Sequence, residues 1–296
     1  MVSAGIQISM PPKGLYHGFY FIIIISAIMI IDSCTATSGR SFHPSLPGYQ
    51  EKNKELIVLD DYLLEISGIY YLPDGRMAGH NDEKGILFVF DFNHGEHETI
   101  EFSGKGDYED VVQYKDFYYI MESDGDLHKV AVAPPYTAVK IKFLDLKKTE
   151  FESLYVDSAA ERLVLLTKDH RNPFRGILAY GFDINSQQFL PEPVYQIPLT
   201  DILSKMHDNT AECKPSAAAV HPIEKKVYVI ASVGKAMLIC SLEGKVEQVY
   251  QLNPTQFPQP EGITFAPNGD MYISNEGLHG KATILKFPYS INKSAK

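Results

Sequence analysis

A strand–turn–strand pattern recurs five times along the chain and constrains the fold more than any other feature. The two clearest copies span residues 64–92 and 260–287, and aligning their turns places Asp74-Gly75 on Asn268-Gly269. Three weaker copies span 108–132, 151–184 and 214–242. A repeat of roughly 40–50 residues built from strands is typical of β-propeller blades. The sequence therefore predicts an all-β fold, a five-bladed β-propeller.

The segments inside each repeat have strand character. FVFDF, FYYIM and KVYVIAS are short, β-branched and aromatic, and turn residues separate them. In Pro73-Asp74-Gly75 and Pro267-Asn268-Gly269, proline presets φ and glycine accepts a positive φ. This alternation of strands and tight turns favours small antiparallel sheets.

One polar position near the start of each first strand gives the spacing of the repeats. Its five residues follow one another at intervals of 42, 43, 64 and 45 residues, and they are Ser67, Glu109, Glu152, Ser216 and Glu261. Only the third interval is long, and residues 185–213 fill the excess. Apolar residues between 197 and 206 follow a helical spacing. We interpret 185–213 as an insertion between the third and fourth blades, with a degenerate sixth blade as the alternative.

The N-terminal segment has the composition of an export signal. Residues 19–31 form an apolar run of thirteen after Lys13, which is too short for a comfortable membrane span. Ile31-Asp32-Ser33-Cys34 resembles a bacterial lipobox, although Asp32 departs from the usual small residue. We expect lipidation at Cys34, with plain cleavage nearby or an uncleaved anchor as alternatives. The expected division is a leader at 1–33, a flexible tether at 34–55 and a propeller domain at 56–290.

Charge and cysteine content exclude several classes of function. The net charge is -10 at pH 7, which argues against a nucleic-acid partner. Cys213 and Cys240 both belong to the fourth repeat, so an oxidising compartment would permit a disulfide, with two buried thiols as the alternative. The zinc spacings CxxC and HExxH are absent from the sequence, as are GxSxG and the P-loop pattern.

Equivalent polar positions of the five blades are expected to converge on a central channel. The five residues named above form one ring. The ends of the second strands form another, which consists of Asn81, Glu122, Lys168, Ser232 and Asn275, with Asp82, Asp169 and Glu276 one residue further along. Converging carboxylates repel one another, and a hard cation such as Ca²⁺ relieves this repulsion with carboxylate and amide oxygens as ligands. We predict a channel Ca²⁺ site from Glu109, Glu152, Glu261, Glu122, Asn81 and Asn275. The alternative is a hydrated tunnel in which Lys168 neutralises one glutamate.

Two other polar features carry weaker predictions. Asp124-Gly125-Asp126 resembles half of a Ca²⁺ loop, or else a tight turn between strands. His80 and His170 would lie near the channel mouth, where a histidine can act as a base, or else in half-exposed loops. His221-Pro222 is expected to begin a turn.

The repeats together resemble a known family. LEISGIYYLPDGRMAGHNDEKGILFVFD, FSGKGDYEDVVQYKDFYYIMES, KPSAAAVHPIEKKVYVIAS and QPEGITFAPNGDMYISNEG are similar to the SdiA-regulated propeller family, distant relatives of NHL-repeat proteins, over residues 57–288. The resemblance implies five blades and a calcium ion, with Glu109, Glu152, Glu261 and Glu122 as the acidic channel positions, but no particular activity. Lys168 at a channel position departs from it. A lipoprotein leader before such a domain resembles proteins of the Bacteroidetes type.

Three classes of function follow from these predictions. We favour a membrane-anchored, extracytoplasmic binding module that recognises a protein or small ligand. The alternatives are a Ca²⁺-dependent hydrolase acting on lactones, esters or phosphoesters, and a structural envelope protein. No catalytic residue is assigned. We expect a monomer in the cell envelope, lipid-anchored and periplasmic or outer-membrane associated, whose strand 57–63 pairs with the last blade to close the ring.

Overall fold

A computed structural model describes residues 46–92, 95–144, 149–169, 175–206, 212–277 and 280–290. Cys34, His170 and the leader at 1–33 lie outside the described residues. Within the part of the chain that the structure describes, no helix is long and apolar enough to span a membrane.

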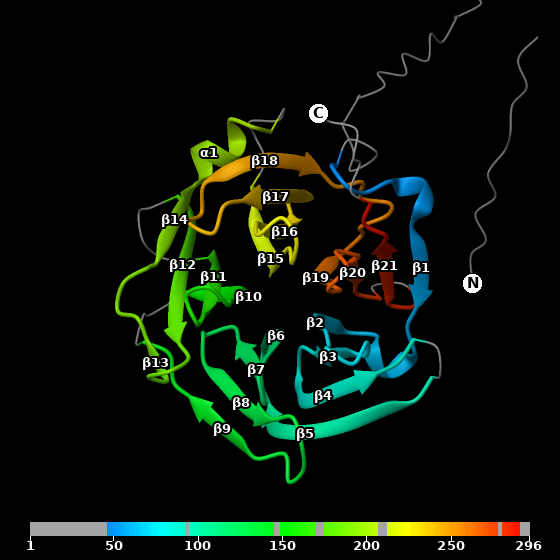
Figure 1. The fold of residues 1–296 in the computed structure, drawn as a ribbon, viewed down its shortest axis with the longest axis vertical. Helices are drawn as coiled ribbons and strands as arrows, with labels where there is room; N and C mark the ends of the chain where they lie inside the picture. Colours follow the sequence, from blue (N-terminus) through cyan, green and yellow to red (C-terminus); the bar gives the residue numbers. More distant parts are fainter. Residues whose placement is uncertain are drawn as a thin grey trace, which may run out of the picture. The chain divides into compact units, whose positions relative to one another are not determined.

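Five small antiparallel sheets are arranged in a ring, and each sheet is one blade (Figure 1). The five-bladed β-propeller expected from the repeats is confirmed. The first blade consists of β2 (Ile66–Tyr71), β3 (Met77–Asn81), β4 (Lys84–Phe90) and β5 (His97–Lys105). The second consists of β6 (Tyr108–Tyr114), β7 (Phe117–Glu122), β8 (Leu127–Ala131) and β9 (Ala138–Ile141). In each blade the first strand lies closest to the ring centre.

The other three blades follow the same order. The third consists of β10 (Glu150–Asp157), β11 (Arg162–Asp169), β12 (Gly176–Asp183), β13 (Gln188–Phe189) and β14 (Tyr195–Pro198). The fourth consists of β15 (Lys214–Val220), β16 (Val227–Val233), β17 (Ala236–Cys240) and β18 (Val246–Gln251). The fifth consists of β19 (Pro260–Phe265), β20 (Met271–Asn275), β21 (Thr283–Phe287) and β1 (Glu55–Val58). Short helical turns are η1 (Glu51–Asn53), η2 (Asp61–Leu63) and α1 (Leu199–Leu203).

The long interval between the third and fourth repeats supplies an outer strand, and the described part of it forms no sixth blade. β13 has only two residues, and β14 pairs with β12 along four residues to complete the third blade. α1 follows directly and buries Ile202, while Met206 just beyond it is also buried. The expected helical face is therefore real but short.

The ring is closed between the two ends of the chain, as the sequence predicted. β1 pairs antiparallel with β21, with Leu56 opposite Leu285. Closure uses 55–58 and not 57–63, because η2 occupies 61–63. Without β1, strand β21 would present an unpaired edge.

The folded domain also begins earlier than predicted. Leu46 and Tyr49 fall in the expected tether, yet both are buried between the fourth and fifth blades. The Tyr49 hydroxyl donates to the Gly269 carbonyl at 2.7 Å and accepts from Nε2 of His221 at 2.8 Å. His221, expected only to begin a turn, therefore also fastens the N-terminal segment to the ring.

Hydrophobic layers between adjacent blades form the core. Each layer takes side chains from the facing sheets of two neighbouring blades. Because every sheet is covered on both faces, runs such as 163–166 and 227–231 are buried continuously. Cys213 and Cys240 border one layer as free thiols, and burial raises the pKa of each to about 12.

Candidate functional site

Every innermost strand contains a β-bulge at the same place. The pairing register shifts between Ile66 and Ile69 in β2, and at the corresponding position of the other four inner strands. The residues in these bulges are the predicted first ring, namely Ser67, Glu109, Glu152, Ser216 and Glu261. A bulge inserts one unpaired residue and re-aims its side chain. Because each of the five inner strands has this bulge, all five blades turn the equivalent side chain toward the channel.

Three glutamates of this ring line one cavity, which we call the acidic cavity. It has a volume of about 460 Å³ and lies at the N-terminal ends of the inner strands. Its carboxylates are Glu65, Asp82, Asp107, Glu109, Glu152, Glu261 and Glu276, and its ammonium groups are Lys168, Lys214 and Lys235. The acids come mainly from blades one, two and five, whereas the lysines come from blades three and four. Negative charge therefore gathers on one side of the cavity.

The two serines of the ring join blades to one another. Ser67 Oγ donates to the Glu109 carbonyl at 2.8 Å, and Ser216 Oγ donates to the Pro260 carbonyl at 2.7 Å. Each bond links an inner strand to that of the next blade. These contacts hold the bulges of Glu109 and Glu261 in place.

Strand register decides which residues of the second predicted ring line the acidic cavity. Asn81, Glu122 and Asn275 pair regularly with the residue that precedes each bulge, and the structure places them outside the acidic cavity. Successive strand residues face opposite sides, so the next residues, Asp82 and Glu276, line the cavity instead. In blades three and four a register shift skips one residue, and Lys168 and Ser232 line the cavity. The predicted ring is therefore displaced by one residue in blades one and five, and Glu122 of blade two lies outside the cavity.

The two asparagines contact loops of their own blades. Asn81 Nδ2 donates to the Tyr62 carbonyl at 3.1 Å, and Asn275 Nδ2 donates to the Gln256 carbonyl at 3.4 Å. His80, expected near the channel mouth, is fully buried, and burial lowers its pKa to about 4. His80 is therefore neutral at pH 7 and has the charge state of a base. It is not one of the residues that line the acidic cavity, however, so it cannot serve as a base there.

Glu122 belongs to an outer cluster with Asp124 and Asp126, whose carboxylate oxygens lie within 4.8 Å of one another. Lysines already neutralise this cluster, because Lys140 Nζ is 2.7 Å from Glu122 and 3.1 Å from Asp126. Asp124 Oδ1 accepts from the Asp126 backbone N–H at 3.0 Å, which is the geometry of a tight turn. The interpretation of 124–126 as a turn between strands therefore accounts for these contacts.

The acidic cavity, in contrast, holds carboxyl groups whose charge is poorly compensated. Burial and the neighbouring Asp107 raise the pKa of Glu109 to about 8, against which Lys168 acts. Burial and Glu276 raise the pKa of Glu261 to about 7. On the other side of the cavity, Lys168 forms an ion pair with Glu152.

The pKa values of two more acids in this cavity are also raised. Burial is the main cause that raises the pKa of Asp82 and of Glu276. Among the described residues, Asp82 Oδ1 is buried without a hydrogen-bond partner. An orphaned carboxylate oxygen facing other carboxyls is the arrangement that a bound cation would satisfy.

The donor set fits a hard cation. Among the described residues that line the acidic cavity, the candidate ligands are carboxylate, hydroxyl and amide oxygens, with no thiol or imidazole. Such oxygens suit Ca²⁺, which tolerates irregular geometry and water ligands. Glu109, Glu261, Asp82 and Glu276 line this cavity with raised pKa values and are therefore the candidate ligands.

No protein-family model and no curated protein matches the chain. Solved structures do match. A gluconolactonase from Xanthomonas campestris has a TM-score of 0.54 and 10% identity over 84% of this chain and 94% of that one. The calcium-binding protein regucalcin from Agrobacterium tumefaciens has a TM-score of 0.51 and 12% identity over 79% of this chain and 94% of that one.

A protein of unknown function from Bacteroides thetaiotaomicron matches with a TM-score of 0.52 and 12% identity. The match covers 75% of this chain and 55% of that longer chain. At 10–12% identity these similarities show the fold alone. The chain is a β-propeller protein similar in fold to these proteins.

Proposed function

We propose that this protein is a binding module whose acidic cavity holds a hard divalent cation, with Ca²⁺ as the expected ion. The observation that carries the proposal is the convergence of Glu109 and Glu261, from the two blades that flank the first, with pKa values raised to about 8 and about 7. A cation at this place would restore both carboxylates to their charged form at neutral pH. The solved regucalcin, of similar fold, is described as calcium-binding, which supports the choice of ion.

The residues of the acidic cavity would have different roles in binding the ion. Glu109, Glu261, Asp82 and Glu276 would contact the ion, whereas Glu152 is already paired with Lys168. When bound, Ca²⁺ supplies open coordination positions that can accept an oxygen of a ligand. Lys235 on the other side of the cavity would attract an anionic part of that ligand. We therefore propose a small molecule or a protein side chain with oxygen ligands as the recognised group.

The resemblance to the SdiA-regulated family is part of this proposal. It is supported by the number of blades, since the sequence has five repeats and the structure has five sheets. Hydrolysis of a lactone, ester or phosphoester is the alternative, in the direction suggested by the gluconolactonase of similar fold. Glu109 and Glu261, with pKa values near neutral, could act as bases in such a reaction, and the assays described below decide between binding and hydrolysis.

We also propose that the protein is exported and anchored through Cys34 in the cell envelope. The apolar run at 19–31 and the lipobox-like Ile31-Asp32-Ser33-Cys34 support this. Growth of the expressing bacterium with labelled palmitate should label the wild type and leave the Cys34→Ala variant unlabelled and released from membranes. Equal labelling of the two would reject anchoring at this cysteine.

The cation proposal is tested by metal analysis of the purified full chain. We expect stoichiometric calcium and a lower melting temperature after chelation, and both should disappear in Glu109→Gln/Glu261→Gln. Glu122→Gln, outside the cavity, is the matched control and should retain the metal. Absence of bound metal and of any chelator effect would reject the site. Calcium-dependent hydrolysis of a lactone, ester or phosphoester that the double variant loses would move the function to the hydrolase class.

A further inference from the structure

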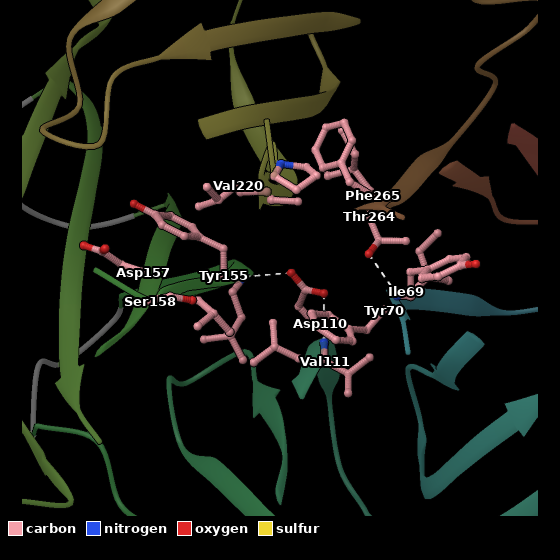
Figure 2. A pocket seen from close by; sticks show the side chains of 18 of the residues that line it. Ile69, Tyr70, Asp110, Val111, Tyr155, Asp157, Ser158, Val220, Thr264 and Phe265 are labelled. Atoms are coloured by element: carbon pink, nitrogen blue, oxygen red, sulfur yellow. Dashed lines mark hydrogen bonds between the residues drawn. The ribbon is translucent and has the colours of Figure 1, made fainter. Parts of the chain in front are cut away.

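A second cavity opens at the other end of the same inner strands (Figure 2). We call it the apolar cavity; its volume is about 460 Å³, and the C-terminal halves of the inner strands surround it. Its walls are mainly aliphatic and aromatic, and include Ile69, Tyr70, Val111, Tyr155, Val220 and Phe265. This volume falls in the range of small-molecule sites, roughly 300–1,000 Å³.

One acid stands out in the wall of the apolar cavity. The side chain of Asp110 is 3% exposed, and Figure 2 shows its carboxylate among the apolar groups. One of its oxygens accepts the Val111 N–H at 2.8 Å, and the other accepts the Leu154 N–H at 2.7 Å. Within the described chain no ion pair reaches Asp110.

The carboxylate at 110 is peculiar to the second blade. Equivalent positions, one residue after each bulge, carry small side chains, and they are Gly68, Ser153, Ala217 and Gly262. A Cβ atom at Gly68 would lie 2.6 Å from Asp110 Oδ1, so the first blade leaves room for this carboxylate. The space around Asp110 is therefore shaped for it.

The other charged groups of the cavity do not compensate Asp110. Asp157 is held by Arg162, whose Nη2 lies 2.9 Å away. Lys225 is exposed at the mouth. Burial raises the pKa of Asp110 well above its ordinary value. Two backbone N–H groups satisfy hydrogen bonding but supply no positive charge.

We propose that the apolar cavity binds a small organic amine, with the ammonium group against Asp110 and an aromatic or branched body against the apolar walls. An ammonium ion offers the positive charge that the buried carboxylate lacks. Aromatic rings such as Tyr70, Tyr155 and Phe265 add contact area and attract a cation through their faces. The residues that line this site differ from those that line the acidic cavity, and Glu109, the chain neighbour of Asp110, links the two electrostatically.

The ligand chemistry is tested on the full chain with three probes. Phenethylamine carries both features, 2-phenylethanol lacks the charge, and methylamine lacks the apolar body. By calorimetric titration we expect phenethylamine to bind at least about 10-fold more tightly than either of the others. Equal affinity for phenethylamine and 2-phenylethanol would overturn the role of Asp110, and equal affinity for methylamine would overturn the role of the walls.

The location is tested with variants. Val220→Phe reduces the cavity volume away from Asp110 and should lower phenethylamine affinity, as should Asp110→Asn. Glu261→Gln/Glu276→Gln changes the acidic cavity but keeps Glu109, the charged neighbour of Asp110, so it should leave the affinity unchanged. Loss of binding in that double variant, with full binding in Val220→Phe, would place the amine in the acidic cavity and reject the proposal. If Asp110→Asn does not fold, the probe series and the other two variants decide.

Discussion

The two ends of the central channel are built from the same five strands yet have opposite chemistry. At the N-terminal ends, seven carboxylates and three lysines line the acidic cavity. At the C-terminal ends, the apolar cavity contains mostly aliphatic and aromatic groups, with Asp110 as its buried acid without an ion pair and Asp157 paired with Arg162. The bulge lies between them and re-aims one residue per blade toward the first end. A single backbone irregularity, repeated in each blade, thus separates electrostatic recognition from recognition by shape.

The largest contrast is expected between two adjacent residues on either side of this division. Asp110→Ala leaves the buried N–H groups of Val111 and Leu154 without acceptors, so it should destabilise the fold by roughly 2–4 kcal/mol. Glu109→Gln removes a repelled, partly buried carboxylate and should leave stability unchanged or raise it slightly in cation-free protein. Urea unfolding of both variants measures the difference. Equal destabilisation would mean that the two ends are not electrostatically distinct.

The acidic cavity should also make stability depend on pH. Below pH 4.5, the ordinary pKa, Glu109 and Glu261 are protonated in the folded and unfolded chains alike. As pH rises, the unfolded chain ionises first, so stability falls until pH exceeds the folded pKa values near 7 and 8. We expect cation-free protein to lose roughly 1–3 kcal/mol between about pH 5 and pH 9, allowing for solvent screening.

Thermal unfolding with chelator present measures this loss. Glu109→Gln/Glu261→Gln should flatten the profile, and so should saturating Ca²⁺. A steep fall that persists in the double variant would assign the pH dependence to other groups.

A smaller effect is expected from the lysine side of the acidic cavity. Lys168→Gln removes a positive charge and frees Glu152 from its ion pair, so Ca²⁺ affinity should rise by about 3–10-fold. Lys245→Gln, on the exposed surface, is the matched control and should change nothing. Calcium titration compares them. A weaker affinity in Lys168→Gln would show that Lys168 supports the ion's ligands and does not oppose the ion.

The smallest effect is expected outside the channel. Asp124→Asn keeps the acceptor for the Asp126 N–H and alters a cluster that Lys140 and Lys142 already neutralise. Calcium content and melting temperature should match the wild type. A loss of bound calcium would locate the ion at this outer turn. The acidic cavity would then not be a metal site.

The repeats predicted the blades and the bulge ring because their phase is set by turns that recur in the sequence. The phase gave Glu109, Glu152 and Glu261 without any knowledge of the bulges. The same phase placed Asn81, Glu122 and Asn275 in the cavity incorrectly. The side of the sheet to which a side chain points depends on register shifts between strands, and these shifts cannot be recognised in the sequence. The apolar cavity was also missed, because Tyr155 and Phe265 resemble core residues until the channel is seen.

Closure by β1 has a consequence for how the chain reaches its native state. The strand at 55–58 finds its partner only after residues 283–287 have been made, so the last blade is completed by a contact of very long sequence separation. Synthesis of nearly the whole chain must therefore precede ring closure. Until residues 283–287 are in place, the outer edge of the last blade cannot form, and 55–58 has no strand to pair with.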